Sequence, residues 1–77
     1  MLTLLTRAEC GLCEALQEEL EQLRQTRSLP QLRLVDVDSD PTLQRRYGLH
    51  IPVLLLDGVE VCRHRLDSAE LLRLLRR

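Results

Sequence analysis

The chain contains 77 residues, of which 44% are hydrophobic, and its 11 arginines nearly balance 12 acidic residues to give a net charge of −1. This length predicts one small domain, residues 1–77, near the lower limit for a self-sufficient apolar core. The charges are scattered, which excludes a basic surface for nucleic acid. No apolar run reaches membrane-spanning length, and residues 2–5 are too short for a secretory signal. We therefore expect a monomeric, cytoplasmic protein.

Short apolar runs and amphipathic stretches follow one another along the chain and predict seven elements of secondary structure. In order, these are a strand at residues 2–6, a helix at 11–24, a strand at 32–37, a helix at 41–47, strands at 53–56 and 59–64, and a helix that ends near 75. The first strand, helix and second strand form a unit that implies parallel pairing of the two strands.

Residues at the ends of these segments support their boundaries. Gly48 closes the second helix, and Asp57-Gly58 predicts a two-residue hairpin turn. Either Asp67 or Ser68 caps the last helix. That helix ends at Arg76-Arg77, where positive charge suits the helix dipole.

The Cys10-Gly11-Leu12-Cys13 segment lies between the first strand and the first helix. Free N–H groups and the dipole of a helix N-terminus favour thiolate over thiol, which makes Cys10 the candidate nucleophile. Cys13 begins a stripe of leucines spaced by three and four residues, so we expect it to face the core. This position favours redox chemistry over the two other readings of a Cys-x-x-Cys pair, half of a zinc site or two buried small residues.

The order βαβαββα, with Cys-x-x-Cys before the first helix and Ile51-Pro52-Val53 at the third strand, resembles the thioredoxin fold in its glutaredoxin-like form. The Tyr47-Gly48-Leu49 stretch is similar to short bacterial glutaredoxin-like proteins. The resemblance implies an α/β fold with a four-stranded mixed sheet and three helices. It also implies that Cys10 attacks a disulfide and that Cys13 resolves the product.

The same resemblance implies a substrate-binding set around the dithiol. Pro52 is expected to be cis and beside the dithiol, so that the backbone of Ile51 can dock an extended substrate. Gly11 and Leu12 occupy the positions of a Pro-Tyr pair in most glutaredoxins. Arg7 matches a position where glutaredoxins often carry a basic residue, and it is either a contact for the glutathione carboxylate or a solvated surface charge.

The sequence therefore predicts a thiol-disulfide oxidoreductase that acts on protein disulfides, glutathionylated proteins or low-molecular-weight disulfides. It needs no bound metal or cofactor, and glutathione is a candidate reductant, although Cys62-Arg63 stands near the place of a Gly-Gly pair that admits glutathione in glutaredoxins. Two alternatives stay open. One is a metal-binding module in which Cys62 and His64 complete a zinc site with the two motif cysteines, and the other is a redox-inactive adaptor.

Overall fold

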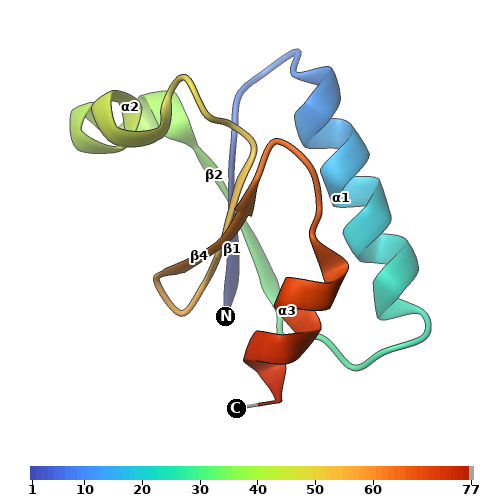
Figure 1. The fold of residues 1–77 in the computed structure, drawn as a ribbon. Helices are drawn as coiled ribbons and strands as arrows, with labels where there is room; N and C mark the ends of the chain where they lie inside the picture. Colours follow the sequence, from blue (N-terminus) through green and yellow to red (C-terminus); the bar gives the residue numbers. More distant parts are fainter. Residues whose placement is uncertain (77) are drawn as a thin grey trace.

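The computed structural model describes residues 1–76 and contains the expected succession of strands and helices (Figure 1). In chain order the elements are β1 (Leu2–Thr6), α1 (Gly11–Arg24), β2 (Leu32–Asp36), the short 3-10 helix η1 (Val37–Ser39), α2 (Pro41–Tyr47), β3 (Val53–Leu56), β4 (Val59–Arg63) and α3 (Ser68–Leu75). The predicted order βαβαββα is confirmed. Arg77, expected at the basic end of the last helix, lies outside the described residues. No helix within residues 1–76 is long and apolar enough to cross a membrane.

The four strands form one mixed sheet in the order β2-β1-β3-β4. β1 is parallel to β2, with Leu2 opposite Leu32 and Thr6 opposite Asp36. β3 is antiparallel to both β1 and β4. The carboxyl ends of β1 and β2 and the start of β3 therefore meet at the same end of the sheet. The predicted four-stranded mixed sheet with three α-helices is confirmed.

Side chains of β1 point alternately to the two faces of the sheet and divide the core into two clusters. Figure 1 shows α1 and α3 close together, with α2 apart from them. The larger cluster, completed by α1 and α3, contains Leu2, Leu4, Leu16, Leu20, Leu54, Val61 and Leu71. The smaller cluster, completed by α2, contains Leu5, Val37, Tyr47 and Val53. Leu16 and Leu20 of α1 are buried against the sheet, and this packing holds the start of the helix in place.

Two predicted strand ends are wrong by one residue. β2 ends at Asp36 rather than at Val37, because the Asp36 carboxylate caps η1 by accepting the N–H of Asp38 at 2.9 Å. β4 ends at Arg63 rather than at His64. The backbone of His64 has a φ of 71°, a left-handed conformation in which a strand cannot continue.

A β-bulge interrupts the simple alternation predicted for β4. Neighbouring residues of β3 pair with Glu60 and Cys62, so Val61 has no partner across the ladder. Val61 is 8% exposed and packs in the larger cluster, whereas Val59 is 58% exposed. The bulge therefore separates two valines that strict alternation places on the same face.

The turn and cap predictions agree with the structure. Asp57 and Gly58 have φ values of 49° and 87°, the positive angles that a two-residue hairpin turn requires. Asp57 also accepts a hydrogen bond from the terminal ammonium of Met1 at 2.8 Å. Asp67 rather than Ser68 caps α3, because its carboxylate accepts the N–H of the residue three positions later at 3.0 Å.

Candidate active site

Cys10 and Cys13 form a disulfide at the start of α1. Their Cα atoms are 5.2 Å apart, within the range that a disulfide spans without movement of the backbone. Cys13 is 3% exposed and faces the core, whereas Cys10 is partly exposed at the tip of the helix. The outer sulfur can therefore be approached from solvent, and the inner one is reached through it.

Cys10 is also the N-cap of α1. Its extended backbone directs Sγ at the free end of the helix, where Sγ accepts the N–H of Cys13 at 3.2 Å. The N–H of Glu14 bonds to the carbonyl oxygen of Cys10 at 3.1 Å and begins the helical ladder. Because the dipole and unpaired N–H groups at this end stabilise negative charge, the same geometry would stabilise a thiolate on Cys10.

The two residues between the cysteines are open to solvent. A Cβ added at Gly11 would meet no atom within 4 Å, and Leu12 is 48% exposed. Leu12, in the first turn of α1, thus presents an apolar surface beside the disulfide.

The segment before β3 contains Ile51 and Pro52, which the sequence predicts to bind substrate. The Ile51-Pro52 peptide bond is cis, and Pro52 is buried. The carbonyl oxygen of Pro52 accepts the N–H of His64 at 2.7 Å. Among the described residues, the N–H and carbonyl of Ile51 take part in no backbone hydrogen bond. Leu49, just upstream, is 93% exposed.

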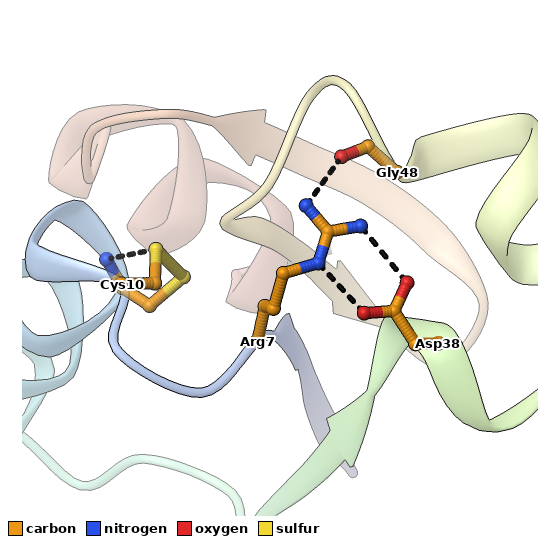
Figure 2. Close-up of a disulfide and its surroundings, with 5 residues drawn as sticks. Arg7, Cys10, Asp38 and Gly48 are labelled. Atoms are coloured by element: carbon orange, nitrogen blue, oxygen red, sulfur yellow. Dashed lines mark hydrogen bonds and ion pairs between the residues drawn. A yellow bond between two sulfur atoms is a disulfide. The ribbon is translucent and has the colours of Figure 1, made fainter.

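Arg7 is bound on two sides, as Figure 2 shows. Its Nε and Nη2 donate to the two carboxylate oxygens of Asp38 at 2.7 and 2.9 Å, and its Nη1 donates to the carbonyl oxygen of Gly48 at 3.2 Å. We call these three residues the Arg7 clasp. The hydrogen bond from Arg7 is the main reason that the pKa of the Asp38 carboxyl lies below its usual range. Arg7 is therefore neither a simple solvated charge nor a cation free of partners.

The clasp joins three segments that meet at one end of the sheet. Arg7 follows β1 and lies three positions before Cys10, Asp38 follows β2, and Gly48 follows α2 and precedes the Ile51-Pro52 bond. Sequence reasoning missed Asp38 and Gly48 as partners of Arg7. The available signal was the parallel pairing of β1 and β2, which places the residues after Thr6 beside the residues after Asp36.

Residues 1–76 match the protein family described as "Glutaredoxin-like domain (DUF836)". The chain belongs to this glutaredoxin-like family. It is 34% identical to the protein in "X-ray structure of Northeast Structural Genomics target protein XcR50 from X. campestris", with a TM-score of 0.76 over 99% of this chain and 96% of that one. The family resemblance predicted from the sequence is confirmed.

Two curated relatives carry no named activity. The chain is 37% identical over 62 residues to "Uncharacterized protein Mb0520" of Mycobacterium bovis and to "Uncharacterized protein Rv0508" of Mycobacterium tuberculosis. Each match covers 74% of this chain and 63% of the relative. The matched region therefore spans less than two thirds of the length of these relatives.

The glutaredoxin-like domain does not assemble the zinc set considered from the sequence. Within residues 1–76, no three Cys, His, Asp or Glu side chains are grouped so that they could hold a metal ion. Cys62 is half-buried against the larger cluster, and burial is the main cause of the raised pKa of its thiol. His64 lies beside His50 instead, with 6.3 Å between the ring centroids.

Proposed function

We propose that this glutaredoxin-like domain is a dithiol-disulfide oxidoreductase that reduces disulfides in proteins or small molecules. The observation that carries the proposal is the position of Cys10, partly exposed at the N-cap of α1 and within bonding distance of the buried Cys13. A nucleophilic sulfur must be accessible and stabilised as a thiolate, whereas a resolving sulfur needs only to reach its partner.

The reaction begins when the Cys10 thiolate attacks one sulfur of a substrate disulfide. A mixed disulfide forms, and the other substrate sulfur leaves as a thiolate that takes up a proton. Cys13, deprotonated, then attacks Sγ of Cys10, which forms the Cys10-Cys13 disulfide and releases the second substrate thiol. Two electrons have passed from the dithiol to the substrate. A low-molecular-weight thiol, for which glutathione is the candidate, returns the enzyme to its reduced state and is itself oxidised to a disulfide.

Substrate binding is proposed to use the walls on either side of Cys10. An extended substrate segment can pair with the free backbone groups of Ile51 as an added strand. Exposed Leu12 and Leu49 offer apolar contact to residues that flank the substrate disulfide, and Gly11 leaves space for them. These interactions suit a protein disulfide. We predict that the protein acts as a monomer in the reducing cytoplasm, and that it binds no cofactor, membrane or nucleic acid.

Variants of the three cysteines test the mechanism. Cys13→Ser should accumulate covalent complexes through Cys10 when it is mixed with a protein disulfide, because the resolving thiol is missing. Cys10→Ser should form none, and Cys62→Ser, the matched control, should turn over like the parent. Non-reducing gels and mass mapping of the linked peptide measure the outcome.

Three results would contradict the proposal or its mechanism. Complexes linked through Cys62 would show that Cys10 is not the nucleophile. A lack of exchange by the parent chain with any disulfide would leave a redox-inactive adaptor as the function. Efficient turnover by Cys13→Ser with glutathione as sole reductant would show instead that Cys13 is dispensable and that the two-thiol step is wrong.

A further inference from the structure

The stretch of chain around the dithiol carries few charged residues. Arg7 is the only Arg or Lys among residues 1–23, and three residues of chain limit the separation of its Cα from that of Cys10 to about 11 Å. Glu9 precedes Cys10 directly, and Glu14 lies in the first turn of α1. Arg7 is therefore the one nearby cation that this stretch of chain contributes to counter two acidic side chains.

Asp38 forms a bidentate ion pair with the guanidinium of Arg7. Both carboxylate oxygens of Asp38 bind the guanidinium, and Gly48 takes a further N–H (Figure 2). Gln44 donates to Asp38 at 3.2 Å and helps to hold the carboxylate in place. A bidentate pair of this kind fixes the guanidinium plane as well as its position. The paired charges nearly cancel for an incoming ligand, so Arg7 adds little net positive charge to the side of Cys10.

We infer that Asp38 is a positioning residue for substrate selection: by holding Arg7, it makes the dithiol prefer neutral and cationic disulfides to anionic ones. This inference rests on the proposed function and names the class of disulfide that the same site accepts. Glutathione and its disulfide carry a net negative charge, so they are the disfavoured class. A protein disulfide flanked by apolar or basic residues is the favoured one.

The size of the effect can be bounded from the chain, which keeps the Cα atoms of Arg7 and Cys10 within about 11 Å of each other. A unit charge released about 10 Å from a reacting anion changes the rate about two- to seventeenfold, between the limits of water and a protein surface. At about 1 M salt the Debye length falls to about 3 Å, and this long-range effect disappears. A role of Asp38 in folding alone would not depend on the charge of the disulfide or on salt in this way.

The test is a single turnover of the full chain. Reduced protein is mixed with excess cystamine (cationic), hydroxyethyl disulfide (neutral) or glutathione disulfide (anionic), and each reaction oxidises Cys10 and Cys13 while it reduces the added disulfide to two thiols. Acid quenching, alkylation and mass analysis of the Cys10-Cys13 peptide give the rate, without interference from Cys62. Rates are compared as the ratio of anionic to neutral disulfide, which removes any general loss of activity.

Asp38→Asn should raise this ratio about two- to seventeenfold at low salt and leave no gain at about 1 M salt. Asp38→Glu keeps the charge and should retain the parent ratio. Glu70→Gln, which breaks the Arg73-Glu70 ion pair within α3, is the matched control and should also retain it. An unchanged ratio in Asp38→Asn, or a change that persists at high salt, would overturn the inference.

The parent chain gives a second test that needs no variant. If Asp38 masks Arg7, Glu9 and Glu14 dominate the local charge, so the ratio of anionic to neutral disulfide should rise as salt is added. A ratio that falls with salt would show that the charge of Arg7 still attracts anions, and it would refute the inference. Failure of the parent to react with all three disulfides would refute the proposed function itself, which separates the two conclusions.

Discussion

Gly48→Ala should destabilise the protein through a collision within the loop that carries the clasp. Gly48 has φ and ψ of −55° and −30°, which any residue adopts, so left-handed geometry is not what requires glycine here. Glycine is required because the surroundings leave no space for a side chain at this position. A Cβ at this position would collide with the carbonyl oxygen of Gln44 and lie 3.4 Å from Nη2 of Arg7. The carbonyl belongs to the backbone of α2 and cannot rotate away as a side chain would.

The cost of such overpacking is about 1–3 kcal/mol. A chain of this length has a free energy of unfolding of about 4–12 kcal/mol, so the loss is a large fraction of the total. Gly11→Ala is the matched control, because it adds the same methyl group at a position with no atom within 4 Å. We expect that control to be neutral or to gain up to about 1 kcal/mol from helix propensity.

Urea denaturation followed by far-ultraviolet circular dichroism measures both variants in the oxidised protein. The reasoning is refuted if Gly48→Ala unfolds at the same urea concentration as Gly11→Ala. A loss accompanied by a changed dependence on denaturant would point to a less compact native state rather than to a local collision.

Two further predictions concern titratable groups. In the reduced protein at pH 7, iodoacetamide should modify Cys10 before Cys62, because burial raises the pKa of the Cys62 thiol; peptide mapping that finds Cys62 first would contradict the assignment. The Asp38 carboxyl has its pKa lowered in the folded state, so its ionised form stabilises the fold above the unfolded pKa and this share is lost as pH falls through the folded value. Asp38→Asn should therefore show a shallower loss of stability as pH falls below about 4, measured by urea titration at each pH, and equal slopes would refute this coupling.

Most of the fold could be predicted because its signals are local. The Asp57-Gly58 turn, the cap at Asp67 and the leucine stripe of α1 each depend on residues within a few positions of one another. The burial of Cys13 and the exposure of Cys10 followed from the same helical spacing. These features needed no knowledge of the sheet.

The features that sequence reasoning missed depend on contacts between distant residues. The bulge at Val61 depends on pairing with β3, so the hydrophobic periodicity of β4 alone does not predict it. The bond between Arg7 and Asp38 joins residues 31 positions apart. Asp38 is one of two aspartates in the four residues after β2, and only the register of β1 against β2 selects it.

The topology explains why the dithiol, the clasp and the Ile51 segment are found together. Parallel pairing brings the ends of β1 and β2 to one edge, and antiparallel pairing of Leu5 with Val53 brings the start of β3 to the same edge. Each strand then contributes the residues just beyond it, which are free of ladder hydrogen bonds and available for chemistry. Arg7 joins η1 after β2 to the end of α2 through its planar guanidinium, a geometry that the single ammonium of lysine cannot reproduce. The positions of Cys10 and of the Arg7 clasp are thus consequences of one sheet register.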